Sequence, residues 1–148
     1  MLIYNKKIIF MDDYKNNIYL EYNDSTIKYN DLTTKQSTSL EPKISFNSNP
    51  SKLYTIISID PDAPSPDNPV NKYHLHMLKI NSNQIINPYQ GPNPPAGSGI
   101  HRYYTCVFEQ DYRLEGIKEQ PRSKFNLEKF IYDHNLKLVG CFKFRVRG

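Results

Sequence analysis

The sequence lacks any apolar run approaching the roughly 20 residues that a membrane-spanning helix needs, and only 38% of its 148 residues are hydrophobic. A signal peptide carries its positive charge before an unbroken apolar segment, whereas Lys6 and Lys7 interrupt the apolar stretch at residues 1–10. Neither a membrane-spanning helix nor a secretion signal is therefore predicted. We expect an intracellular, cytoplasmic protein.

Cysteine is scarce, and internal repeats, linkers and low-complexity tracts are absent. Cys106 and Cys141 are the only two cysteines, and both fall in apolar, strand-like runs. In an intracellular chain this placement predicts two reduced thiols in the core. A chain of this length fits one folded unit with a core of its own, so a single domain over residues 1–148 is expected.

The excess of one charge is small, because 19 lysines and arginines face 15 acidic residues, for a net charge of +4. The basic residues are scattered except near the end of the sequence, at Lys137, Lys143, Arg145 and Arg147. The last three alternate with apolar residues, which predicts a strand with one solvated basic face. A patch for anionic lipid or nucleic acid is the alternative interpretation.

Tyrosine, isoleucine, valine and phenylalanine dominate the periodic segments, and turn signals recur between them, which favours an all-β, mainly antiparallel domain. Asn23-Asp24 reads as a hairpin turn, and the nearly apolar segments 53–59 and 103–108 read as central strands. One helix is predicted, capped by Asn126 and ending near Asn135. The predicted strands are Lys7–Met11, Ile18–Tyr22, Ser25–Tyr29, Ile44–Phe46, Leu53–Ile59, Leu75–Asn81, His101–Glu109 and Val139–Val146.

A proline-rich acidic segment, Asp60-Pro61-Asp62-Ala63-Pro64-Ser65-Pro66, directly follows an apolar strand. Each proline fixes its own φ and restricts the residue before it, so the segment can aim Asp60 and Asp62 at little entropic cost. One or more of its X-Pro bonds is hypothesised to be cis. A plain turn with solvated acids is the alternative.

Histidines supply a second group of candidate site residues. His74 and His76 are two apart in a predicted strand and should share a face, as should His101 and Tyr103, while Arg102 points the other way. Hydrogen-bonded histidines are the plainer interpretation, and a metal half-site at His74 and His76 is the alternative. Between these pairs, residues 87–99 form a predicted ordered loop rich in proline and glycine.

These motifs, in this order and spacing, resemble the phosphatidylethanolamine-binding protein family, also called the Raf kinase inhibitor protein family. The resemblance rests on residues 52–55, 60–65, 75–76, 94–97, 99–103 and 108–110, and it continues more weakly from Arg122 through the predicted helix to the last strand. It implies a β-sandwich with Greek-key connections, one or two short helices and a small anion pocket near the strand ends.

The resemblance also implies which residues act. Donors on the histidines and the tyrosine would bind phosphate oxygens. Asp60 would either orient an imidazole and keep it protonated or act as the partner of a protonated phosphate. Asp62 and Arg102 would form a supporting ion pair, and no catalytic residue, metal or cofactor is expected. The implied ligand-binding residues are Asp60, Pro64, His74, His76, Gly91, Asn93, Pro95, His101 and Tyr103.

Two departures from the family pattern affect the pocket. His74 stands where a large aromatic residue is usual, which should make the rim more polar and pH-sensitive. The sequence ends at Gly148, soon after the last predicted strand, whereas longer members add a C-terminal helix that helps to close the pocket. A more open site is therefore expected.

The resulting expectation is a non-enzymatic regulator of signalling that binds a phospholipid head group or another phosphate-bearing small molecule. An inhibitor or scaffold that binds a kinase or protease through its surface is the first alternative. A metal-assisted hydrolase using His74, His76 and an aspartate is the second. Peripheral contact with a membrane fits these expectations, and a nucleic acid partner is not expected.

Overall fold

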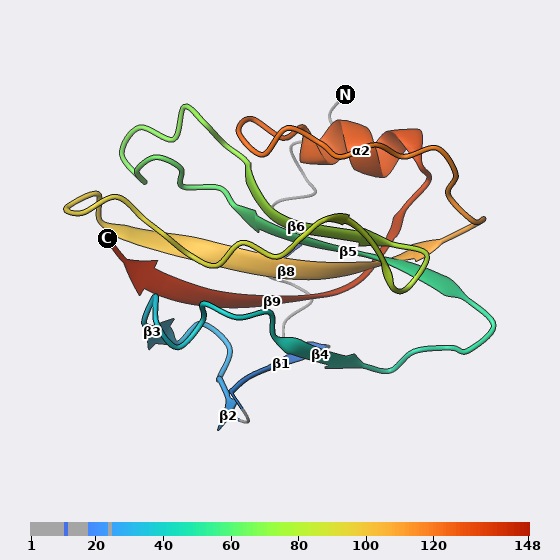
Figure 1. Ribbon diagram of the computed structural model, residues 1–148, viewed down its shortest axis with the longest axis horizontal. Coiled ribbons are helices and arrows are strands. Elements are labelled where there is room, and N and C mark those ends of the chain that lie inside the picture. Colours follow the sequence, from blue (N-terminus) through green and yellow to red (C-terminus); the bar gives the residue numbers. More distant parts are fainter. Residues whose placement is uncertain (1–10, 12–17, 24) are drawn as a thin grey trace.

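The long central strands of one sheet are buried on both faces. The computed structural model describes Met11, residues 18–23 and residues 25–148. Its six-stranded sheet has the order β3-β9-β8-β5-β6-β7, and Figure 1 shows the long strands of this sheet lying side by side. The strands are β3 (Leu32–Thr33), β5 (Leu53–Asp60), β6 (His74–Ile80), β7 (Gln84–Asn87), β8 (Ile100–Gln110) and β9 (Lys137–Arg147).

Side chains alternate between the two faces of the sheet with the period of two that a strand imposes. On β5, Tyr54 and Ile56 join one core, and Ile57 and Ile59 join the other. The predicted central position of this strand is confirmed, because it pairs with β6 on one side and β8 on the other.

A three-stranded sheet covers one face. It consists of β1 (Ile18–Tyr22), β2 (Ser25–Thr26) and β4 (Lys43–Phe46) in the order β2-β1-β4. Ile18 and Leu20 of β1 share a core with Phe142 and Phe144 of β9, and Figure 1 shows these short strands below the large sheet. The predicted sandwich and its Greek-key connections stay predictions, since this packing alone does not establish them.

Helix α2 (Leu127–Asp133) covers the opposite face. The Asn126 side chain accepts a hydrogen bond from the Lys129 amide, so the predicted cap is confirmed. Leu127, Phe130 and Ile131 point into the core on that face. Among the described residues, no helix is long and apolar enough to cross a membrane.

Several predicted boundaries need correction. The strand expected at Ser25–Tyr29 is limited to Ser25–Thr26, although it pairs with β1 across the predicted turn, where Asn23 has φ 51°. The edge strands β3 and β7 were not predicted. The large sheet is mixed rather than wholly antiparallel, because β3 runs parallel to β9. The strand expected at Lys7–Met11 lies outside the described residues, except for Met11, which is buried.

The expectation of two reduced thiols is wrong. Cys106 and Cys141 lie directly opposite each other on β8 and β9, with Cα atoms 4.1 Å apart, and form a disulfide. Both cysteines are buried. Reduced thiols were expected because disulfides persist mainly in oxidising compartments and the protein was expected to be cytoplasmic. The bond removes that argument.

Candidate functional site

A cavity of about 320 Å³ opens at the end of the large sheet where β5 ends and β6 and β8 begin. All nine residues expected to bind a ligand line it: Asp60, Pro64, His74, His76, Gly91, Asn93, Pro95, His101 and Tyr103. The sequence did not point to four further lining residues, Ala63, Asn71, Gln90 and Pro94. The cavity therefore combines the acidic segment, both histidine motifs and the loop between β7 and β8.

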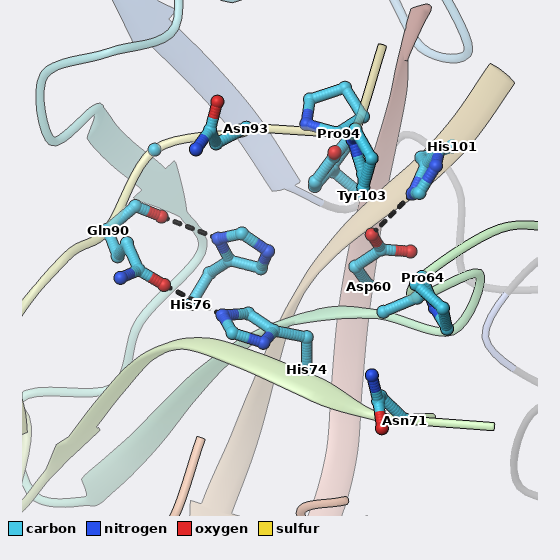
Figure 2. A pocket seen from close by; sticks show the side chains of 13 residues that line it. Asp60, Pro64, Asn71, His74, His76, Gln90, Asn93, Pro94, His101 and Tyr103 are labelled. Atoms are coloured by element: carbon cyan, nitrogen blue, oxygen red, sulfur yellow. Dashed lines mark hydrogen bonds and ion pairs between the residues drawn. The ribbon is translucent and has the colours of Figure 1, made fainter. Parts of the chain in front are cut away.

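The proline-rich segment turns back at the rim of this cavity. Its Ala63–Pro64 peptide bond is cis, in line with the hypothesis for this segment, and Pro64 lines the opening. The Ala63 carbonyl accepts a hydrogen bond from the Asn71 amide, which closes the turn. Asp60 is thereby placed at the end of β5 with its side chain toward the cavity (Figure 2).

A β-bulge brings His76 into the site. In the pairing of β5 with β6, Ser58 lies opposite Met77 and Ile59 lies opposite Leu75, so His76 is the extra residue. A bulge bends its strand and redirects a side chain. Here both histidines of β6 reach the cavity, with their ring centroids 4.7 Å apart.

Gln90 holds both of these rings. Its backbone carbonyl lies 2.6 Å from His76 Nδ1, its side-chain Oε1 lies 2.7 Å from His74 Nε2, and its amide donates to the His76 carbonyl. Figure 2 shows the two contacts to the imidazoles side by side. No sequence motif marked Gln90, because its role depends on how the loop packs against β6.

The tautomer of His76 follows from these contacts. A carbonyl oxygen only accepts, so Nδ1 must carry the hydrogen and Nε2 is left as the acceptor of a neutral ring. Burial lowers the pKa of His76 to about 3. His76 is therefore a neutral ring at neutral pH, because desolvation outweighs the hydrogen bond to Gln90.

His101 lies between Asp60 and Ser98. Its Nδ1 is 2.8 Å from Asp60 Oδ2 and its Nε2 is 2.8 Å from Ser98 Oγ, so both nitrogens are occupied. Burial raises the pKa of Asp60, against the lowering effect of the hydrogen bonds from His101 and from the Asp62 amide. The order Ser-His-Asp is that of a hydrolase triad, but Ser98 is not among the residues that line the cavity. Its hydroxyl therefore fixes the imidazole and supplies no nucleophile to the cavity.

Tyr103 forms one wall of the cavity. Its ring contacts His76 edge-on at 5.3 Å between centroids and stacks on Phe144 at 5.4 Å. Burial, followed by the nearby Asp60 carboxylate, raises the pKa of the Tyr103 hydroxyl above its ordinary value. The phenol thus stays protonated at neutral pH and keeps its O–H as a donor.

Arg102 points to the other side of β8, where it pairs with Asp62. Its Nε and Nη2 lie 2.9 and 2.8 Å from the two Asp62 carboxylate oxygens, and its backbone amide donates to the same carboxylate. Burial raises the pKa of Asp62, but the hydrogen bonds and charge of Arg102 outweigh it and hold that pKa below its ordinary value. The pair ties the acidic segment to β8 behind the cavity.

Two further residues set the position of the loop. The guanidinium of Arg122 donates to the carbonyls of Leu75, His76 and Pro88, which joins β6 to the start of the loop. Gly91 lies against the backbone of Ser39, where an added Cβ would approach within 3.0 Å. These contacts fix the side of the cavity that carries Gln90 and Asn93.

His74 and His76 were considered as half of a metal site, but the described residues supply no third ligand beside them. In the part of the chain that the structure describes, no three histidine, cysteine or acidic side chains are grouped so as to hold a metal ion. Both imidazoles are instead bonded to Gln90.

The chain is similar to several known proteins. A candidate odorant-binding protein, A5, of Drosophila melanogaster is 37% identical over 129 residues, or 76% of this chain, and the chain spans 61% of that protein's length. A crystal structure of carboxypeptidase Y inhibitor complexed with its proteinase superposes with a TM-score of 0.76, at 20% identity over 97% of this chain and 92% of that one.

A phosphatidylethanolamine-binding protein from Plasmodium vivax superposes with a TM-score of 0.75, at 18% identity over 99% of this chain and 97% of that one. At these identities the two structures support the fold alone. The sequence model of the phosphatidylethanolamine-binding proteins matches residues 20–85 and 78–142, which include every residue of the cavity. The chain therefore belongs to the phosphatidylethanolamine-binding protein family.

Proposed function

We propose that this chain is a single-domain, non-enzymatic binding protein whose cavity receives a phosphorylated head group and whose role is regulatory. The convergence of Asp60, His76, His101 and Tyr103 on one small cavity supports this proposal. A volume of about 320 Å³ is at the lower end of ligand pockets. This volume suits a head group or a small anion. It is too small to hold the acyl chains of a lipid in addition to its head group.

The polar groups of the cavity suit an oxyanion that is held without a nearby lysine or arginine. Tyr103 contributes a hydroxyl donor, and Asn71 and Asn93 contribute amide donors at the wall and the rim. His101 and the loop are held rigid by contacts behind the surface, which lowers the ordering cost of binding. The absence of an accessible activated nucleophile in the described lining favours binding over turnover.

The comparison structure of carboxypeptidase Y inhibitor bears on the first alternative, a surface that binds a protease. That similarity is 20% in sequence and concerns the fold. No feature of the described surface favours a protease or kinase partner, so the pocket carries the proposal.

The proposal is tested by Tyr103→Phe, which removes only the donor hydroxyl and keeps the ring packed on Phe144. We expect the affinity for O-phosphoethanolamine, measured by calorimetry, to fall about tenfold through loss of one hydrogen bond to a charged ligand. Tyr112→Phe is the matched control, because Tyr112 is 48% exposed and outside the cavity lining. Equal affinity in both variants would show that the ligand does not occupy this cavity.

A further inference from the structure

The hydrogen-bonding groups that face the cavity are unevenly divided between acceptors and donors. His76 Nδ1 is committed to the Gln90 carbonyl, and its Nε2 makes no hydrogen bond to the described residues. Because none of their buried side-chain polar atoms is left unpaired, this Nε2 lies open to the cavity that His76 lines. The two Asp60 oxygens each receive one hydrogen bond, from His101 and from the Asp62 amide, and a carboxylate oxygen has room for a second. The cavity thus offers acceptors beside its donors, whereas an oxyanion is itself an acceptor.

The charges in the described lining point the same way. None of the residues that line the cavity is a lysine or arginine, and Asp60 is the one acidic residue among them. Two guanidinium groups on neighbouring elements are turned elsewhere, that of Arg102 to Asp62 and that of Arg122 to three backbone carbonyls. An oxyanion that carries no hydrogen of its own would meet a carboxylate and a bare imidazole nitrogen, both repulsive to it.

We propose that the pocket selects oxyanions that bring a hydrogen-bond donor of their own and rejects those that have none. This inference rests on the proposed function and specifies its ligand. The donor would be received by His76 Nε2 or by Asp60, while Tyr103 and the asparagine amides bind the remaining oxygens. Hydrogen phosphate and phosphate monoesters carry such a donor as P–OH, and an ethanolamine head group carries one as its ammonium. Sulfate is tetrahedral and similar in size but has no proton to donate at neutral pH.

Two donor sources give different dependence on pH. A phosphate monoester that donates through P–OH must keep its second proton, so its affinity should fall about tenfold per pH unit above its second pKa, which is near 6. Binding from the monoester dianion at higher pH should take up close to one proton, whereas inorganic hydrogen phosphate keeps a P–OH at pH 8 and needs no proton uptake. A head group that donates through its ammonium should show a flat profile from pH 5 to 8.

Other titratable groups face His76 and must be separated from this effect. His74 lies beside it on β6, His101 and Tyr103 lie on β8, Asp60 lies on β5, and Arg122 contacts its carbonyl. If a charged histidine were the main binding group, sulfate and phosphate would gain affinity together as the pH falls. The difference between the two anions therefore isolates the donor requirement from the titration of these neighbours.

The experiment measures binding of inorganic phosphate, sulfate, glycerol 3-phosphate and glycerophosphoethanolamine to the folded protein by calorimetry at pH 6 and pH 8, in two buffers of different ionisation enthalpy. We expect phosphate at pH 6 to bind at least about tenfold more tightly than sulfate, because sulfate would cover the two acceptors without giving them a hydrogen bond. Arsenate should behave as phosphate does, and selenate as sulfate does. Glycerophosphoethanolamine, a phosphodiester without P–OH, reports the ammonium source, and inorganic phosphate reports the P–OH source.

The variant His76→Gln replaces the fixed acceptor with an amide that can also donate, so the preference for phosphate over sulfate should shrink toward unity. His134→Gln is the matched control, because His134 lies outside the cavity lining. Equal affinity of the wild-type protein for phosphate and sulfate, or binding of glycerol 3-phosphate at pH 8 without proton uptake, would overturn the donor requirement but not the pocket. Failure of both phosphate and glycerophosphoethanolamine to bind would overturn the proposed function itself.

Discussion

Strands β5, β6 and β8 have a buried polar cluster at each of their two ends. The two clusters differ in how their hydrogen bonds are used. At the end away from the cavity, Gln110 of β8 donates to Asn81 Oδ1 and to the Tyr112 carbonyl. Gln110 Oε1 accepts from the Thr55 hydroxyl and from the backbone amide of Asn81. The side-chain Nδ2 and Oδ1 of Asn81 are also hydrogen-bonded. We call Thr55, Asn81 and Gln110 the closed cluster, because its polar atoms are all paired.

At the cavity end, Asp60, His76, His101 and Tyr103 form what we call the open cluster. Burial is as deep as in the closed cluster, with His101 1% and Gln110 3% exposed. Yet His76 Nε2 and the Tyr103 hydroxyl can each form a further hydrogen bond, and both belong to residues that line the cavity. Buried polar residues therefore do not mark a site by themselves, and unused hydrogen-bonding capacity beside a cavity is the stronger signal.

The largest effect is expected from removing the disulfide, which joins β8 and β9 between the two clusters. Cys106 and Cys141 are separated by 35 residues, and release of that loop in the unfolded chain should lower the free energy of unfolding by about 4 kcal/mol. The double variant Cys106→Ala/Cys141→Ala, compared with wild type in urea titrations, measures this loss. Affinity for phosphate in the folded double variant should be unchanged; a parallel loss would mean that the open cluster depends on the whole sheet.

The next largest effect is expected at the closed cluster. Gln110→Ala leaves the Thr55 hydroxyl and the Asn81 amide buried without partners, at a cost of about 3 kcal/mol in the free energy of unfolding. Gln84→Ala is the control, because Gln84 accepts from the same Asn81 side chain but is exposed to solvent, so its loss should cost only about 0.5 kcal/mol. Phosphate binding should not change in either variant. Weakened binding in Gln110→Ala would erase the distinction between the clusters.

Much of this arrangement could be predicted from the sequence, since the apolar runs indicated β5 and β8, and the histidine motifs together with the family resemblance implied nine residues that line one cavity. The missing parts depend on register and loop packing. A bulge at His76 and a disulfide between facing strands follow from pairings that no local pattern reveals. The short edge strands β3 and β7 have no long apolar run to mark them.

Gln90 shows the limit most clearly. It binds both imidazoles of β6 through one carbonyl and one amide, and this decides that His76 presents an acceptor. Nothing in the sequence separates Gln90 from the other polar residues of its loop. The residues of the open cluster were therefore predictable, but their protonation states and the direction of their hydrogen bonds were not.

The smallest effect, and the sharpest test of the comparison, concerns Asp62. It lies two residues from Asp60 yet behaves like a member of the closed cluster, because Arg102 occupies both of its oxygens. Asp62→Asn should lower the free energy of unfolding by only about 1 kcal/mol, since the Arg102 side chain is 42% exposed and its charge is screened. Phosphate affinity should stay within about twofold of wild type, because the pair faces away from the cavity.

The pH dependence of this loss has a definite sign. The pKa of Asp62 is lowered in the folded protein, so its contribution is present above the ordinary value of about 3.9 and is lost as the pH falls through the lowered pKa. The unfolding free energies of wild type and Asp62→Asn should therefore differ at pH 6, and the difference should shrink as the pH falls below the ordinary carboxyl range. Asp67→Asn, which removes one carboxylate at an exposed position just after the segment, is the control. Asp62→Asn could instead abolish phosphate binding at unchanged stability. The site would then be defined by position in the acidic segment, and not by whether a residue's hydrogen-bonding capacity is already used within the protein.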